Sequence, residues 1–203
     1  MSGSPETLPN EEGDIITSQT ILWQGILLPG HEACRLFSLG SHWHLEGMAV
    51  FSHEQKPCQL NYLVVCDALW HTLSASIEGW LGNKFVNIKL STDTNQHWWM
   101  NDVEISEVKG CIDFDLNFSP STNTIPIRRL NLRVGEKVDI TVAWLKFPGF
   151  TLEPLAQRYQ RLEEGLYRYE SGGGRYVADL RVNRSGFVID YPGIWKAEAS
   201  SDW

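Results

Sequence analysis

The chain has 203 residues, a length typical of a single domain, and 42% of them are hydrophobic, which argues against a wholly disordered protein. Its 17 lysines and arginines face 25 aspartates and glutamates, so the net charge is −8 at pH 7. An acidic chain without a basic run is poorly suited to bind nucleic-acid phosphates or to dock electrostatically on anionic membranes. Because it also has no run of about 18 apolar residues, we expect neither a nucleic-acid partner nor integral membrane association.

The first residues, MSGSPETLPNEEGD, are acidic and rich in turn formers. We predict a flexible tail over residues 1–14 and a single β domain over residues 15–203. The tail has neither the basic nor the apolar segment of a secretory signal, which favours a cytoplasmic location. In that reducing compartment the four cysteines, which form no CxxC motif, are expected to be small core residues: Cys34, Cys58, Cys66 and Cys111.

A pair of alternating histidines, His42 and His44, is the first chemically notable pattern along the chain. On a strand the two imidazoles and the carboxylate of Glu46 share one face, an arrangement that many metal sites use. No third ligand follows at a fixed spacing, so packed or solvated histidines are the expected outcome and no metal site is predicted. His42 and His44 stay candidates for proton transfer.

Most of the remaining chain shows the two-residue hydrophobic period of β-strands. The predicted strands cover residues 59–65, 85–90, 111–118, 138–145 and 176–182, and Ser185-Gly186 supplies a hairpin turn into residues 187–189.

Two carboxylates, Asp113 and Asp115, lie two residues apart within the predicted strand 111–118 and would share one face. Such a pair can hold a cation, work as acid and base, or form ion pairs. Arg128 and Arg129 follow on what reads as a short extended stretch, where alternation sends them to opposite faces. We therefore predict that Asp113 or Asp115 pairs with Arg128 or Arg129 across neighbouring strands.

One segment has the period of a helix. Leu152, Leu155, Tyr159 and Leu162 recur at helical spacing after a possible N-cap at Thr151. The sequence thus predicts a mainly β protein in which a large curled antiparallel sheet forms an incomplete barrel, with one amphipathic helix near residues 152–165 packed on its concave side.

The aromatic content is high, with nine tryptophans, six tyrosines and eight phenylalanines. A curled sheet leaves a hollow that side chains or a ligand must fill, and aromatic rings line pockets for apolar ligands and stack on sugars. We expect an apolar cavity lined by Trp70, Trp98, Tyr191 and Trp195.

Several motifs resemble the putative glycolipid-binding family over about residues 20–197. They are Gly110-Cys-Ile-Asp-Phe-Asp-Leu116, Ser119-Pro-x-Thr-Asn-Thr-x-Pro-Ile-Arg-Arg-Leu130, Asp67-x-x-Trp70, Gln157-x-Tyr159 and Gly186-Phe-Val-Ile-Asp-Tyr-Pro-Gly-x-Trp195. The resemblance implies an incompletely closed barrel with a helix, and a role in holding a glycolipid or another lipid-like molecule in an apolar cavity. The candidate ligand-binding residues are Asp67, Trp70, Trp98, Arg128, Tyr159, Tyr191 and Trp195.

Two functions remain open. The first is non-catalytic binding of a lipid-like or glycolipid small molecule. The alternative is a cofactor-independent enzyme (an isomerase, cyclase or hydrolase) that acts on an apolar metabolite in the same cavity, with His42, His44, Asp113 and Asp115 as candidate catalytic groups. No cofactor is predicted, because residues 172–174, the Gly-Gly-Gly run, lack the context of a phosphate-binding loop. The sequence indicates neither the ligand's identity nor the oligomeric state.

Overall fold

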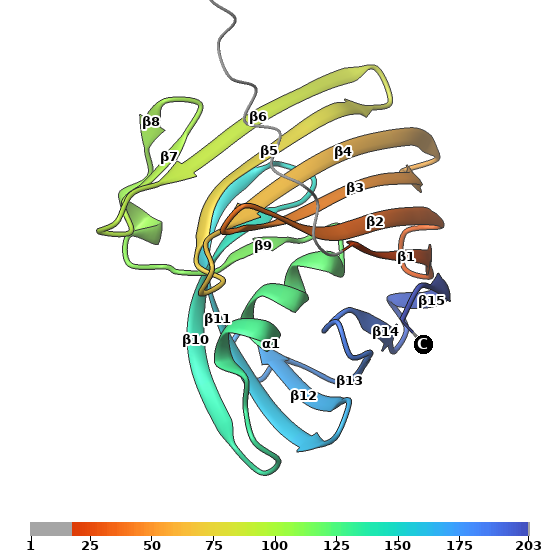
Figure 1. The fold of residues 1–203 in the computed structure, drawn as a ribbon. Coiled ribbons are helices and arrows are strands. Elements are labelled where there is room, and N and C mark those ends of the chain that lie inside the picture. Colours follow the sequence, from red (N-terminus) through yellow and green to blue (C-terminus); the bar gives the residue numbers. More distant parts are fainter. Residues whose placement is uncertain (1–17, 203) are drawn as a thin grey trace, which may run out of the picture.

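The computed structural model describes residues 18–202, which form one 15-stranded β-sheet that curls around a short helix without closing into a barrel (Figure 1). The predicted mainly β fold with an incomplete barrel is therefore confirmed. The tail predicted over residues 1–14 lies outside the described residues, and the division into a tail and one domain stays a prediction.

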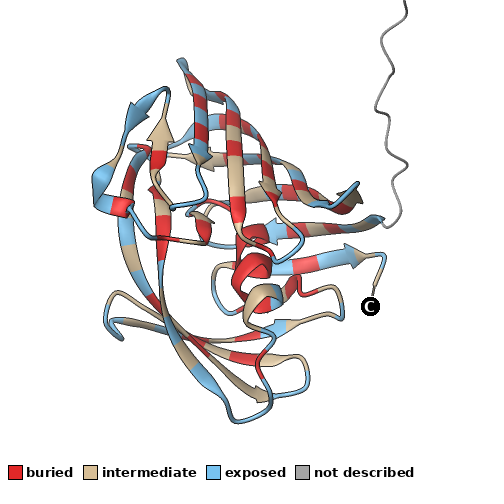
Figure 2. Ribbon diagram, turned by 60° about the vertical axis from the view of Figure 1, so that its left-hand side comes forward, coloured by how far each residue is buried: buried red, intermediate tan, exposed pale blue. Residues whose placement is uncertain are grey.

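The first arm of the sheet is a run of hairpins in which each strand pairs antiparallel with the next along the chain. Its strands are β1 Ser18–Gly25, β2 Gly30–Leu39, β3 His42–His53, β4 Lys56–Cys66, β5 Thr72–Leu81, β6 Lys84–Thr92, β7 Trp98–Met100 and β8 Val103–Glu104. Buried and exposed residues alternate along these strands because one face covers the core, which gives the bands in Figure 2.

The second arm returns to meet the first. Its strands are β9 Phe114–Leu116, β10 Lys137–Lys146, β11 Thr151–Glu163, β12 Leu166–Ser171, β13 Tyr176–Val182, β14 Val188–Tyr191 and β15 Trp195–Ser200. The short β9 runs parallel to β10, and the strands from β10 to β15 pair antiparallel in chain order. β15 also pairs with β1, so the arms join at this contact and the short strands β8 and β9 form the two edges.

The single α-helix of the described residues, α1 (Thr124–Leu130), lies in the hollow of the curled sheet (Figure 1). Residues 124–127 are all buried, since sheet surrounds this turn of the helix on several sides. Pro126 is tolerated because it lies in the first turn, where its missing N–H has no intrahelical partner. Within residues 18–202, no helix is long and apolar enough to cross a bilayer.

The helix predicted near residues 152–165 is wrong, because residues 151–163 form strand β11 in the interior of the sheet. β11 pairs along its length with β10 on one side and β12 on the other. Its buried residues include Gln157 and Tyr159, which follow the two-residue period rather than the helical one. Two flanking ladders of hydrogen bonds thus override a segment with ordinary helix propensity. Leu155 accordingly faces the concave side from a strand, not from a covering helix.

The other elements agree better with the sequence. Predicted strands 59–65, 85–90, 138–145 and 176–182 lie within β4, β6, β10 and β13. Only the centre of the predicted strand 111–118 is a strand, as β9, and the expected extended stretch at Arg128 and Arg129 is the end of α1. All four cysteines are buried and unpaired, as predicted for core residues.

Candidate functional site

Two pockets lie near the two ends of helix α1. The first, which we call the tyrosine pocket, has a volume of about 320 Å³ and reaches the start of the helix at Asn123. Its walls include Asp115, Ser119, Trp144, Leu155, Tyr169, Tyr176, Tyr191 and Trp195. The second, which we call the arginine pocket, has a volume of about 730 Å³ and reaches the end of the helix at Arg128. It includes Trp70, Ile127, Arg161, Tyr167 and Arg184.

Three strands supply the aromatic wall of the tyrosine pocket. Tyr169 on β12, Tyr176 on β13 and Tyr191 on β14 form a triangle whose ring centroids are 6.1–6.2 Å apart. Trp195 on β15 lies directly opposite Tyr191 in the hairpin register. Since cross-strand partners share a face, adjacent strands of the curled sheet present these rings together. The three tyrosine rings meet at interplanar angles of 51–76°, so the wall presents both faces and edges of aromatic rings.

A carboxylate borders this aromatic wall. Asp115 on β9 is partly buried and accepts a hydrogen bond from Gln157 Nε2 on its Oδ2, at 2.6 Å. Burial raises the pKa of the Asp115 carboxyl to about 6, and the Gln157 hydrogen bond partly opposes that shift. Near neutral pH the group is therefore mostly an anionic acceptor, which suits the hydroxyl groups of a ligand.

A second layer of hydrogen bonds fixes the wall from behind. Tyr159 is fully buried, contacts the Tyr169 ring at 5.2 Å between centroids, and accepts a hydrogen bond from Asn123 Nδ2 at 2.9 Å. Burial raises the pKa of Tyr159 well above its usual range, so the phenol stays neutral. Tyr159 was predicted to bind ligand, but it supports the pocket without lining it.

An acidic residue that the sequence did not single out lies behind Ser119, which itself lines the tyrosine pocket. Glu32 on β2 is completely buried, and its Oε1 accepts hydrogen bonds from Tyr62 and from Ser119, both at 2.5 Å. Its Oε2 is buried without a partner in the described part of the chain, and burial raises the Glu32 pKa to about 8. The sequence signal for Glu32 was a charged residue at a core-facing position, because it shares the two-residue period of the apolar residues Cys34 and Leu36 along β2.

The other predicted ligand-binding residues are distributed over the fold. Tyr191 and Trp195 line the tyrosine pocket, whereas Trp70 and Arg128 line the arginine pocket. Trp98 is fully buried in the core, where its Nε1 donates to the Cys111 carbonyl at 2.9 Å. The four aromatic residues proposed for one cavity therefore do not meet in one place.

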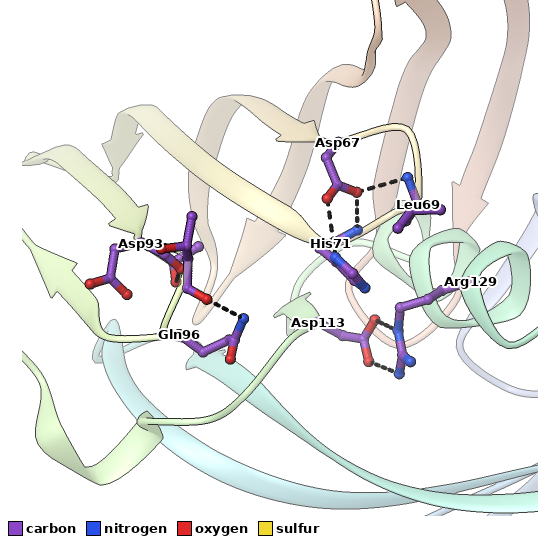
Figure 3. Close-up of polar contacts among 9 residues, drawn as sticks. Asp67, Leu69, His71, Asp93, Gln96, Asp113 and Arg129 are labelled. Atoms are coloured by element: carbon purple, nitrogen blue, oxygen red, sulfur yellow. Dashed lines mark hydrogen bonds and ion pairs between the residues drawn. The ribbon is translucent and has the colours of Figure 1, made fainter.

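Asp67 forms a turn (Figure 3). One of its carboxylate oxygens accepts the backbone N–H groups of Leu69 and His71, both at 2.8 Å, and the other lies 3.1 Å from Nδ1 of His71. This turn holds Trp70 at a φ of 68°, a backbone conformation that large side chains rarely adopt. Asp67 thus sets the position of Trp70 at the arginine pocket and does not line that pocket itself.

The predicted ion pair between the two motifs exists, with a different geometry. Arg129 Nε and Nη2 donate to the two carboxylate oxygens of Asp113, at 2.7 and 2.6 Å (Figure 3). The arginine comes from α1 and not from a neighbouring strand, which corrects the expected cross-strand pairing. Asp113 is buried and committed to this pair, so it does not join Asp115 in the tyrosine pocket.

The histidine pair lies apart from both pockets. His42 and His44 are on the face of β3 opposite to that of the buried Leu45. The His44 ring stacks on Phe37, its Nδ1 is buried without a partner among the described residues, and burial lowers its pKa. Among residues 18–202, no three His, Cys, Asp or Glu side chains gather in a way that could hold a metal ion. The candidate catalytic groups therefore do not converge.

Comparison with known proteins agrees with this architecture. A DUF1089 family protein from Pseudomonas aeruginosa has a solved structure that is similar with a TM-score of 0.70 and 28% sequence identity, over 96% of this chain and 99% of that one. A beta-barrel-like protein of the family DUF1849 from Brucella abortus matches with a TM-score of 0.57 over 92% of this chain and 98% of that one; at 8% identity it shows the fold alone. No curated protein matches. A family model with the description putative glycolipid-binding matches residues 20–197, from β1 into β15, and the chain therefore belongs to that family.

Proposed function

We propose that the protein binds a glycolipid or a similar amphipathic small molecule, with the polar head of the ligand in the tyrosine pocket. The observation that carries this proposal is the meeting of aromatic faces from β12, β13 and β14 with the carboxylate of Asp115. A sugar ring presents C–H faces that pack on aromatic rings, and hydroxyl edges that need acceptors and donors. The wall and the Asp115 carboxylate supply both.

The size and the rim of the pocket also fit an amphipathic ligand. Its volume of about 320 Å³ is at the lower end of small-molecule sites, which suits a head group of one or two rings rather than a whole lipid. Leu27, Leu155 and Ile194 add apolar surface, and the Leu27 side chain is 66% exposed. This apolar surface gives an aliphatic chain a place to leave the pocket.

A cofactor-independent enzyme is supported by one observation, the pKa of Asp115 near 6 inside the pocket. Acid–base catalysis generally needs a second group within reach of the same substrate. The direct partner of Asp115 is the amide of Gln157, which does not titrate, and Asp113 is held by Arg129. Ligand binding needs only the Asp115 carboxylate as an acceptor, whereas acid–base catalysis needs a second titratable group beside it. The binding function therefore fits the pocket better.

The binding proposal predicts a dependence on chain length. Octyl, decyl and dodecyl glucosides, each below its critical micelle concentration, should quench the fluorescence of Trp144 and Trp195, which line the pocket. Affinity should rise with each added CH₂ by up to about fourfold, since burying one CH₂ is worth about 0.8 kcal/mol. Equal affinity for all three glucosides would contradict an apolar exit path for the chain.

Two substitutions test the head-group contacts. Asp115→Asn should weaken binding of decyl glucoside by about tenfold or more, because a hydrogen bond to a charged acceptor is worth about 1.5–3 kcal/mol. The wild type should also lose affinity as the pH falls from 7 to 5, since the Asp115 carboxylate is protonated through its pKa of about 6, whereas Asp115→Asn should not. Asp139→Asn, an exposed aspartate paired with Arg158, is the matched control and should leave affinity unchanged.

The aromatic wall is tested in the same titration. Tyr176→Ala should also weaken binding of decyl glucoside by about tenfold, because it removes a ring face from the pocket. Val177, the next residue along β13, is exposed on the opposite face of the strand, so Val177→Ala controls for a change in the strand itself. A Tyr176→Ala variant that binds as the wild type does would rule out the tyrosine pocket as the head-group site.

A further inference from the structure

We propose that the arginine pocket is a second binding site, which takes a phosphomonoester group. This pocket, of about 730 Å³, lies at the opposite end of α1 from the tyrosine pocket. The proposal does not depend on glycolipid binding, because it rests on a different set of residues. The side chains that carry it are Trp70, Arg128, Arg161, Tyr167 and Arg184.

The first observation is an excess of positive charge. Three separate elements bring arginines to the pocket: Arg128 from α1, Arg161 from β11 and Arg184 from the turn between β13 and β14. Glu164 is the one carboxylate among the residues that line it. A cluster of like charges is unfavourable unless an opposite charge compensates it, and in a chain with a net charge of −8 this cluster is not a consequence of composition.

The second observation is that these guanidinium groups have no carboxylate partner. Within residues 18–202, ion pairs hold Arg35, Arg129, Arg158 and Arg168, and none involves an arginine of the pocket. Arg161 donates from Nη1 to the Leu132 carbonyl at 2.9 Å, but its Nε is buried with no hydrogen-bond partner in the described part of the chain. An arginine without a carboxylate partner keeps N–H groups available to an anion that enters the pocket.

The third observation is that two of the arginines are held in place without their charge being neutralised. The Arg128 guanidinium lies 5.3 Å from the centre of the Trp70 ring, and that of Arg161 lies 5.8 Å from the centre of the Tyr167 ring. Trp70 also stacks on Trp43, with 5.0 Å between ring centres. Aromatic rings restrict an arginine while leaving its N–H groups available, so the rotamer entropy lost on binding an anion is reduced.

The turn that carries Arg184 is also fixed to the helix. Asn183 Oδ1 accepts the Phe187 N–H at 2.9 Å and so closes the turn. Thr124 Oγ1, at the start of α1, donates to the Gly186 carbonyl at 3.2 Å. Gly186 has a φ of 91°, and a Cβ there would approach Arg128 Cδ to 3.1 Å, so the glycine allows the turn and the arginine to pack closely. The exposed Arg184 side chain thus extends from a positioned loop.

Phosphate chemistry fits this site better than a neutral sugar does. Guanidinium groups match the oxygens of a phosphate in planar, bidentate geometry, and a phosphomonoester carries nearly two negative charges at pH 7. The volume exceeds what inorganic phosphate alone needs, which leaves room for an organic group beside the Trp70 and Tyr167 rings. The phosphomonoester head group of phosphatidic acid and the phosphate of a soluble sugar phosphate share this chemistry.

The test is calorimetric titration of the whole chain with three probes at low ionic strength: inorganic phosphate, glucose 1-phosphate and dihexanoyl phosphatidic acid. We expect binding of at least one organic phosphate to weaken by about tenfold or more in Arg184→Gln and in Arg128→Gln, and to weaken as salt is added. Tighter binding of dihexanoyl phosphatidic acid than of glucose 1-phosphate would identify a lipid headgroup as the source, and the reverse a soluble metabolite.

Arg175→Gln is the matched control. It removes the same charge as Arg184→Gln, but Arg175 is an exposed residue that lines the tyrosine pocket and not the arginine pocket. It should change phosphate affinity by less than about twofold. Arg184→Gln should in turn leave the affinity for decyl glucoside unchanged, which separates this proposal from the proposed function. Failure of both organic phosphates to bind, or an equal loss in Arg175→Gln and Arg184→Gln, would overturn the phosphate site.

Discussion

Replacing Arg129 with alanine is expected to lower the free energy of unfolding by about 3–5 kcal/mol, because it leaves a buried carboxylate without its partner. Asp113 is 1% exposed and receives two parallel hydrogen bonds from the Arg129 guanidinium. Burial raises the Asp113 pKa while Arg129 opposes that shift, so removal of the arginine leaves only the cost of desolvation. Urea denaturation at pH 7, followed by circular dichroism, measures the change.

The neighbouring arginine supplies the control. Arg128 is exposed and forms no ion pair among the described residues, so Arg128→Ala should cost less than about 1 kcal/mol. The double variant Asp113→Asn with Arg129→Ala should recover part of the loss, since a neutral amide is less costly to bury than a charge. Equal stability of Arg129→Ala and the wild type would show that the pair contributes nothing to the fold.

Replacing Glu32 with glutamine is expected to stabilise the protein at alkaline pH by about 5 kcal/mol. The Glu32 pKa is about 8 in the folded chain, against 4.5 for the ordinary carboxyl. Between these values the unfolded state has released the proton and the folded state retains it, so the wild type loses stability as the pH rises. The loss accumulates at about 1.4 kcal/mol per pH unit from pH 4.5 to pH 8 and is absent in the variant.

The measurement is a series of urea denaturation curves at pH 4.5, 6, 7.5 and 9 for both proteins. The amide retains an oxygen to accept the hydroxyls of Tyr62 and Ser119, so the two proteins should have similar stability at the acid end. Glu78→Gln, an exposed residue on β5, should instead show the same pH dependence as the wild type. If the stabilities of Glu32→Gln and the wild type change in parallel across this range, the pKa of Glu32 in the folded protein is not raised above its ordinary value.

The parts of the fold that could be predicted are those in which local pattern and tertiary environment agree. Strands β4, β6, β10 and β13 have apolar residues at alternate positions because one face of each covers the core. The sequence of β11 has leucines at spacings compatible with a helix, but its core-facing positions include the polar Gln157. That residue is buried because it bonds Asp115, 42 positions earlier in the chain, and a local pattern cannot show such a partner.

Helix α1 could not be predicted for the opposite reason. Residues 124–127 are buried on every side, so the segment has no polar face and hence no helical period. Its position depends on side chains that bond distant backbone groups, such as Thr124 to the Gly186 carbonyl. The same holds for the candidate site. Tyr191 and Trp195 could be identified from the sequence, whereas Tyr169 and Tyr176 join them only because β13 pairs with β12 on one side and with β14 on the other.

The contact between β1 and β15 has a consequence for the order of folding. The hydrogen bond between Thr20 and Ser201 joins residues 181 positions apart, and until it forms β1 has a free edge in the middle of the future sheet. At ribosomal rates of about 5–20 residues per second, β1 waits roughly 9–35 seconds for its partner strand β15. Such non-local pairing folds slowly, and an unpaired strand edge that carries Ile21 and Trp23 is a site for aggregation. We therefore expect the nascent first arm to need protection by chaperones, and closure of the sheet to be the last step of folding.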